Sequence, residues 1–279
     1  MPVVSFWSNS NKTIGQTVSA ATVATNLAYD HNYKVLMMSA DFKDATLENC
    51  FGAQQANKAI LKTVLSGSQK VNFGTGIDGL LTMAKVNRVN PDLIKDYTKI
   101  IFSNRLEILY SSYNEEIPFE TQLEYYKTII LSASKYYDYV IVDLKKGTWT
   151  SKIFDILEMS HVIVLNTEQG VDTLNDFLAI EGMQDMVKKR KVLWNICRYD
   201  KKSKYNTKNL TRAAWKRETV YSTPYNTLLY EASHESTLPD LIIKLKTARA
   251  EDENTEVVKE ATKLGEGIIQ RYKELQMRM

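Results

Sequence analysis

Residues 3–28, VVSFWSNSNKTIGQTVSAATVATNLA, decide the fold of this chain. They begin with the apolar run VVSFW, continue through a polar stretch, and end in small residues that recur at helical spacing. Gly15 stands where the polar stretch meets the predicted helix, a position at which a residue without a Cβ permits a tight turn. The pattern predicts a strand, a loop and a helix whose N-terminus could face an anion.

The polar loop is close to the phosphate-binding pattern G-x-x-x-x-G-K-[ST] but lacks its lysine. In that pattern backbone N–H groups surround the phosphates, the lysine reaches the β- and γ-phosphates, and the hydroxyl holds Mg²⁺. Gly15 and Thr17 fit the end of the pattern, whereas Gln16 occupies the lysine position. A second register, Asn11-Lys12-Thr13, restores a lysine but loses the spacing to the helix. Taken alone, the stretch does not distinguish a phosphate site from an ordinary connection.

Strands and helices alternate along the rest of the chain. The runs KVLMM (34–38), YVIVD (139–143) and VIVLN (162–166) are typical of parallel strands buried on both faces. Shorter strands are predicted at 106–110 and 191–195, and helices at 18–29, 57–65, 92–102, 119–136, 171–186 and 257–276. No linker-like segment interrupts the pattern. The sequence therefore predicts one doubly wound α/β domain over residues 1–279, with a mostly parallel sheet and helices on both faces.

Composition indicates a soluble cytoplasmic protein. The chain has 279 residues, of which 44% are hydrophobic, and no apolar run approaches the roughly 18 residues that span a bilayer. The start, MPVVSFWSNS, has neither the basic residues nor the cleavage site of a signal peptide. Cys50 and Cys197 are far apart and form no metal or redox motif. We expect no membrane span.

Positive charge is concentrated in residues 188–217. This segment has twelve basic residues and one acid, Asp200, so its net charge is +11, which leaves −8 for the rest of the chain. The bias indicates a polyanionic partner such as DNA. The alternatives are a solvated basic loop and a dock for an acidic protein. The candidate nucleic-acid contacts are Lys188, Lys189, Arg190, Lys201, Lys202, Lys204 and Arg212.

Further segments follow the first in a recognisable order. Residues 34–41 read KVLMMSAD, residues 137–144 read YDYVIVDL, and residues 192–200 read VLWNICRYD. The motifs TPYN (223–226) and YEA (230–232) come next. In order and spacing, these segments and the loop resemble the ParA/MinD family of P-loop ATPases. Members of that family position plasmids, chromosomes, division sites or secretion machines, and the resemblance covers nearly the whole chain.

The resemblance assigns roles around the loop. Gly15, Gln16, Thr17 and Val18 fall on the family's G-K-T-T, and Asn11 falls on the signature lysine that touches the partner subunit's nucleotide. Both family lysines are therefore replaced, and Lys12 is left as a cation that could swing into the phosphate site.

Outside the loop the resemblance implies four more site residues. Asp41 would orient the attacking water, and Asp143, with Thr17, would hold Mg²⁺. Asn195 would read the adenine edge, and the segment containing Pro224 would close over the base. Lys145 and Lys146 stand where the family has prolines, ahead of Gly147 in the switch II turn.

The resemblance implies a homodimeric positioning or partition factor that binds ATP or ADP with Mg²⁺. Because the loop lysine supplies charge compensation in phosphoryl transfer, we expect little or no hydrolysis. Lost lysines also occur in members that accompany pilus or secretion ATPases, such as TadZ. A pseudo-ATPase scaffold or localisation factor is therefore the alternative, and a true ATPase using Lys12 is a third hypothesis. We expect the final helix to pack on the core rather than to act as a membrane hook.

Overall fold

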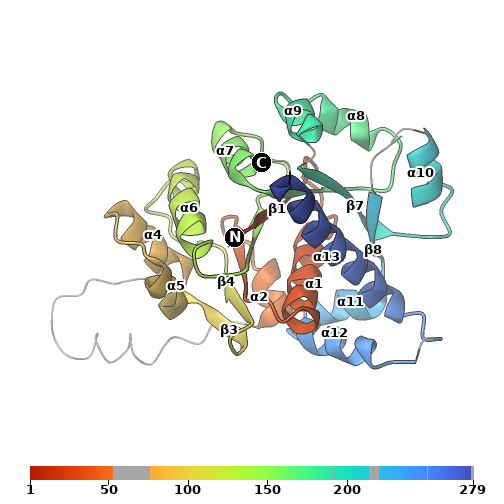
Figure 1. Cartoon of the computed structure of the whole chain (residues 1–279), viewed down its shortest axis with the longest axis horizontal. Coiled ribbons are helices and arrows are strands. Elements are labelled where there is room, and N and C mark those ends of the chain that lie inside the picture. The colour runs from red at the N-terminus through yellow and green to blue at the C-terminus, as the bar shows by residue number, and fades with distance from the viewer. Residues whose placement is uncertain (53–75, 190, 214–219, 250, 278–279) are drawn as a thin grey trace.

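The computed structural model describes residues 1–52, 76–189, 191–213, 220–249 and 251–277. Among these residues, eight strands form one sheet in the order β3-β4-β2-β5-β1-β6-β7-β8 (Figure 1). The strands are β1 (Val3–Trp7), β2 (Val35–Ala40), β3 (Lys99–Phe102), β4 (Leu106–Leu109), β5 (Tyr139–Leu144), β6 (Val162–Thr167), β7 (Val192–Tyr199) and β8 (Val220–Pro224). All neighbours pair in parallel except β3 and β4. The doubly wound α/β fold expected from the sequence is confirmed.

The central strand β1 shows how the apolar runs divide between two cores. Val3 and Trp7 point into one hydrophobic cluster, while Val4 and Phe6 point into the other. This alternation follows from the two-residue period of a strand. Since β1 lies between β5 and β6, its carboxyl end is the point where the strand order reverses. In such sheets ligands bind at that point.

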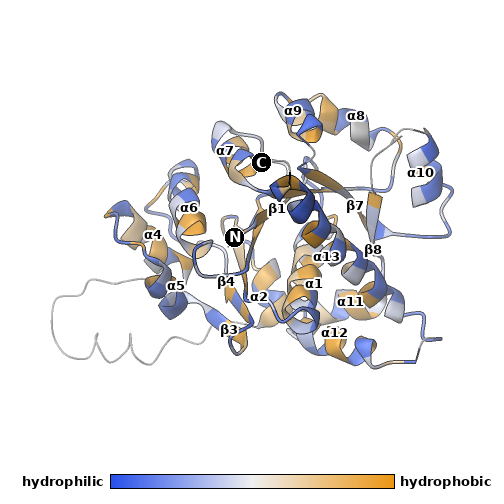
Figure 2. Cartoon of the chain, viewed as in Figure 1, coloured by the Kyte–Doolittle hydropathy of each residue, from blue (hydrophilic) through white to orange (hydrophobic). Residues whose placement is uncertain are grey.

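Two helical layers cover the sheet. One contains α4 (Ile77–Lys85), α5 (Pro91–Tyr97), α6 (Phe119–Ala133), α7 (Ser151–Met159), α8 (Thr173–Leu178), α9 (Met183–Lys188) and α10 (Thr207–Ala213). The other contains α1 (Gln16–Asp30), α2 (Thr46–Phe51), α11 (Thr227–Ala232), α12 (Leu238–Lys246) and α13 (Thr255–Gln276). In Figure 2 the strands β1 and β7 are mostly orange, whereas α10 is mostly blue.

Helix α13 packs on the core, as expected. Its apolar residues, including Val257, Leu264 and Ile268, are buried in the same cluster as α1. The helices approach closely because α13 has Gly265, where a Cβ would lie 3.2 Å from Asn26 Oδ1 of α1. Arg271 also donates to the carbonyl of Val192 at 2.8 Å. Within the described residues, no helix combines the length and apolarity needed to cross a membrane.

Two predicted helices differ from the structure. The segment 92–102 is a helix only to Tyr97, after which the run KIIF, with two β-branched isoleucines, becomes the edge strand β3 and pairs with β4. The segment 171–186 is broken into α8 and α9 by Gly182, whose φ of 79° is left-handed. The predicted helix 57–65 lies outside the described residues. Helices α2, α7, α10, α11 and α12 and strand β8 were not predicted as elements.

Trp7 has a packing role. It is fully buried, its Nε1 donates to the carbonyl of Thr148 at 3.2 Å, and its ring contacts those of Trp149 and Phe177. The indole therefore fills the core at the end of β1.

Candidate functional site

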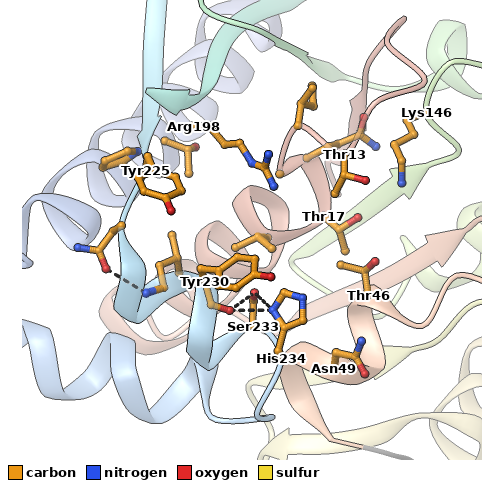
Figure 3. Close-up of a pocket in the computed structure, with 18 residues that line it drawn as sticks. Thr13, Thr17, Thr46, Asn49, Lys146, Arg198, Tyr225, Tyr230, Ser233 and His234 are labelled. Atoms are coloured by element: carbon orange, nitrogen blue, oxygen red, sulfur yellow. Dashed lines mark hydrogen bonds between the residues drawn. The ribbon is translucent and has the colours of Figure 1, made fainter. Parts of the chain in front are cut away.

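A cavity of about 230 Å³ lies at the carboxyl edge of the sheet, where α1 begins. The end of the β1–α1 loop and the first turn of α1 form one wall through residues 13–18. Other walls come from Thr46 and Asn49 of α2, Lys146 after β5, Arg198 of β7, and residues between Thr223 and His234. Figure 3 shows these side chains around a common space. The cavity is thus at the switch point of the sheet.

The structure favours the first register of the loop. Gly15 has the left-handed φ of 95° and precedes Gln16, the first residue of α1. Its carbonyl accepts from Ser19 N at 2.9 Å, which closes the first helical turn. Gly15, Gln16, Thr17 and Val18 all line the cavity, and α1 has no acid in its first turn. The helix N-terminus is therefore open to an anion.

Gln16 points into the sheet. Its Nε2 lies 2.7 Å from Asp143 Oδ1, 2.7 Å from the carbonyl of Leu144 and 3.3 Å from that of Phe6. Only 4% of the residue is exposed, and its buried Oε1 has no hydrogen-bond partner among the described groups. The side chain that replaces the loop lysine thus bridges the ends of β1 and β5.

Asp143 lies beneath the start of α1. Its Oδ2 accepts from Thr17 Oγ1 at 2.6 Å, and its Oδ1 accepts from Gln16. Burial raises the pKa of Asp143 to about 7; the two hydrogen bonds act in the opposite direction, and the charges of Asp44 and Asp41 add to the rise. Thr17 and Asp143, the two residues that the resemblance assigns to Mg²⁺, are therefore in contact. A hydroxyl and a carboxylate are suitable oxygen donors for that ion.

The two remaining loop candidates point away from the cavity. Lys12 is paired with Glu168 at 3.2 Å, and its side chain is 77% exposed. Asn11 lies against the turn after β5, because a Cβ on Gly147 would be 1.7 Å from Asn11 Oδ1. The Gly147 N–H also donates to the carbonyl of Ser8 at 2.8 Å. The loop and this turn are therefore locked together.

We expect Gly147→Ala to destabilise the protein by about 3 kcal/mol, because the methyl group overlaps Asn11 and the φ of 66° is left-handed. Urea denaturation measures the change in the free energy of unfolding. Gly170→Ala is the matched control, since its Cβ would meet only Thr173 Cγ2, at 3.5 Å. Equal stability of the two variants would contradict the packing described for this turn.

Asp41 follows β2 and does not line the cavity in this structure. Its Oδ1 accepts from the N–H of Phe42 at 2.6 Å and lies 4.0 Å from Lys145 Nζ. Burial raises its pKa, although the hydrogen bond from Phe42 opposes the shift. Nearby, Asp44 pairs with Lys146 at 3.5 Å. Burial alone would raise the pKa of Asp44, but hydrogen bonds from Thr46 and the charge of Lys146 together lower it.

Asn195 is enclosed behind the cavity. It is fully buried, and its Nδ2 contacts Ser19 Oγ at 3.0 Å, Asn166 Oδ1 at 2.9 Å and Thr223 Oγ1 at 3.1 Å. The amide thus joins α1, β6 and β8 rather than facing the cavity. Pro224, at the end of β8, does line it.

Sequence reasoning missed much of the wall opposite α1. Arg198, Tyr225, Tyr230 and His234 line the cavity, and the rings of His234 and Tyr230 are in tilted contact with centroids 4.4 Å apart. Figure 3 shows the bonds that fix His234 to Ser233 and to the carbonyl of Tyr230. The only signal for this wall was the TPYN and YEA motifs, which gave no individual roles to the aromatic residues.

The basic segment does not form one face. Lys188 and Lys189 lie before β7, and Lys201, Lys202, Lys204 and Arg212 lie after it. The eight residues of β7 separate the two groups by roughly 26 Å. Lys188 pairs with Asp185 at 3.2 Å and Lys189 approaches Glu158 at 4.0 Å, whereas no ion pair is found for the second group within the described ranges. Arg190, Lys216 and Arg217 lie outside the described residues.

Comparison with known proteins gives structural neighbours only. Neither a family model nor a curated protein matches the sequence. A ParA family ATPase from Chlorobium tepidum is similar over 95% of this chain and 98% of its own, at 15% identity and a TM-score of 0.67. MinD from Pyrococcus horikoshii, solved with Mg-ADP, is similar over 96% of this chain and 95% of its own, at 16% identity and a TM-score of 0.67.

A plasmid partition protein from Borrelia burgdorferi bound to AMPPNP is similar over 99% of this chain and 98% of its own, at 15% identity and a TM-score of 0.57. The shared architecture thus extends over nearly the full length of each chain. The chain has the fold of the ParA/MinD P-loop ATPases.

Proposed function

We propose that this chain is a positioning or partition factor that binds ATP or ADP at the cavity beside α1 and hydrolyses it slowly or not at all. The observation that carries the proposal is the position of Gln16. It occupies the lysine position at the start of α1, yet its amide is held by Asp143 and by two carbonyl groups. The site thus keeps the helix N-terminus and loses the loop cation.

Retained groups support binding. Gly15 leaves the first turn of α1 open to the cavity, and Thr17 and Asp143 are in contact as a pair that could hold Mg²⁺. Two of the structural neighbours were solved with Mg-ADP and AMPPNP. We infer that the phosphates lie against α1 and the base lies toward Pro224 and Tyr225. Asn195 would support the base side of the cavity from behind.

Lost groups argue against turnover. Charge compensation by the loop lysine is part of phosphoryl transfer in this class of site, and Gln16 carries no charge. Asn11 replaces the second lysine, and Lys12 is paired with Glu168. Asp41 keeps the place of the residue that orients water, but without these cations the reaction is slow.

We also propose that the active form is a homodimer.

The test is a titration with a fluorescent ATP analogue, with and without Mg²⁺, followed by an assay of phosphate release. We expect saturable binding strengthened by Mg²⁺ and little release. Complete absence of binding would favour the alternative, a scaffold or localisation factor for a pilus or secretion machine. One observation favours that alternative: neither Gln16 nor Lys12 presents charge to the cavity.

Nonspecific DNA binding is a further part of the proposal. Lys201, Lys202 and Lys204 are exposed at the same edge of the sheet as the cavity. We expect their replacement by glutamate to weaken binding to every duplex sequence about equally. It should also flatten the slope of log K against log salt by roughly 0.9 for each phosphate that is no longer neutralised. Fluorescence anisotropy at several salt concentrations measures both effects.

The control for this experiment is the double variant Lys188→Glu, Lys189→Glu at the opposite edge, where both lysines already have acidic neighbours. We expect it to change binding less than the triple variant. If the wild type does not bind duplex DNA at low salt, with or without ATP, the partition role is wrong and the scaffold role takes its place.

A further inference from the structure

Two cations from outside the β1–α1 loop reach the cavity. Lys146 comes from the turn after β5, and Arg198 comes from the end of β7. In Figure 3 they lie on opposite sides of Thr13 and Thr17, with Arg198 extended toward Thr13. The first turn of α1 therefore has positive charge on both sides, although the loop itself supplies none.

The backbone directs Arg198 to this position. The pairing of β7 with β8 shifts register between Ile196 and Tyr199, and Arg198 has a left-handed φ of 51°. Such irregularities re-aim side chains, and they are strained for a residue with a Cβ. As a result, Arg198 Cγ lies 3.9 Å from where a Cβ of Gly15 would be. No acidic partner of Arg198 is found in the part of the chain that the structure describes.

Lys146 is held in place by one acid. Its Nζ lies 3.5 Å from Asp44 Oδ2, while the other oxygen of Asp44 accepts from the N–H of Thr46 at 2.7 Å. Asp44 is thus anchored to the start of α2 and keeps Lys146 beside the cavity. A phosphate in the cavity would compete with Asp44 for the ammonium group, because both are oxyanions.

Gln16 adds no charge to this wall, because its amide is held at the ends of β1 and β5. Gln16 is nine-tenths buried, lines the cavity, and has an Oε1 without a hydrogen-bond partner among the described groups. The cavity thus combines two cations with a helix N-terminus that has no acid in its first turn.

We propose that Arg198 and Lys146 replace the loop lysine and hold the phosphate chain of a nucleotide against the first turn of α1. The inference rests on the proposed function, since it specifies how the same cavity holds nucleotide. Arg198 contributes a planar group that can bond two phosphate oxygens, and Lys146 contributes a point charge from the other side. Asp44 holds Lys146 when no phosphate is bound.

The experiment measures the affinity of fluorescent ATP, ADP and adenosine analogues for Arg198→Gln and Lys146→Gln. Each variant should bind ATP and ADP about tenfold more weakly or worse, since each loses a charged hydrogen bond. Adenosine affinity should stay unchanged. Arg88→Gln and Lys135→Gln remove the same charges from exposed positions outside the cavity and should leave all three affinities unchanged. Arg198→Lys and Lys146→Arg should recover much of the loss.

A gain-of-affinity variant covers the case in which a glutamine variant does not fold. Asp44→Asn retains an acceptor for Thr46 but no longer holds Lys146 by charge, so ATP should bind more tightly than to the wild type. Inorganic triphosphate should compete with the ATP analogue, and it should do so more weakly in Arg198→Gln. Such competition identifies the phosphate chain as the group that these cations bind.

The outcomes separate the two proposals. If the wild type binds neither ATP nor ADP, the proposed function fails. If the wild type binds both and the two glutamine variants bind equally well, the role of Arg198 and Lys146 is wrong while the proposed function stands. Equal weakening of ATP and adenosine would place these side chains on the base or ribose and would also overturn the inference.

Discussion

A lysine in place of Gln16 is expected to raise the affinity for ATP by about tenfold or more, because a charged hydrogen bond contributes roughly 1.5–3 kcal/mol. The pocket around Gln16 Nε2 already suits an ammonium group. Three oxygens surround it, those of Asp143, Leu144 and Phe6. An amide NH₂ has two hydrogens for these acceptors, whereas an ammonium has three. Lysine would therefore rest on Asp143 and reach the phosphates when nucleotide enters.

Calorimetric or fluorescence titration of Gln16→Lys with Mg-ATP measures the gain, and phosphate release measures any turnover that returns. Gln16→Met is the control, since it has a similar length but neither donor nor charge, and it should bind no more tightly than the wild type. If lysine and methionine have the same effect, Gln16 does not occupy the lysine position.

The rate of phosphate release by the wild type is a second test of the expected loss of ATP hydrolysis. We expect very slow phosphate release that Lys12→Ala does not change further, because Lys12 is paired with Glu168 at the surface. A rate typical of active family members, unaffected by removal of Lys12, would refute the view that the site is degenerate. A normal rate abolished by that change would instead show that Lys12 serves as the missing cation.

Continuous apolar runs made the sheet predictable. The runs that became β1, β2, β5 and β6 are buried on both faces, and most of their residues are hydrophobic because no position faces water. The contact between Thr17 and Asp143 was implied by the family resemblance, and the structure supplies its physical reason. Thr17 lies in the first turn of α1, a short loop after β1, and Asp143 lies one residue before the end of β5, so the parallel pairing of these strands brings them to the same edge.

The directions of the polar side chains could not be predicted. Arg198 reaches Gly15 through a shift in strand register and a left-handed backbone, and an arginine in the sequence does not indicate a left-handed residue. Lys146 looked like a simple replacement of a proline, yet its pairing with Asp44 depends on the contact between two loops. The basic segment 188–217 was expected to form one patch, because a count of charges along the sequence takes no account of the length of β7.

The carboxyl group of Asp143 makes stability depend on pH. Burial raises its pKa to about 7 in the folded protein, from an ordinary value of 3.8. Between these two pH values the folded state holds a proton that the unfolded state has released. The free energy of unfolding falls with rising pH wherever the folded state binds more protons than the unfolded state. The protein therefore becomes less stable as pH rises through this range. Above pH 7 the contribution is lost.

For Asp143 alone the fall amounts to at most about 4 kcal/mol, at 1.36 kcal/mol per pH unit. Burial also raises the pKa of Asp41, so that group acts in the same direction. Urea denaturation between pH 4.5 and about 8 measures the slope. Asp143→Asn does not titrate and should give a flatter profile, and the infrared band of a protonated carboxyl group checks the ionisation of the wild type directly.

Magnesium should reverse the dependence of stability on pH, because the ion binds the Asp143 carboxylate and competes with its proton. If Thr17 and Asp143 hold Mg²⁺ as proposed, the stabilisation by Mg-ATP should be larger at pH 8 than at pH 6. ATP without the metal should show a smaller difference between these pH values, since it does not depend on a charged Asp143. A pH profile that is the same in the wild type and in Asp143→Asn, with and without Mg²⁺, would show that Asp143 is ionised in the free protein and holds no metal.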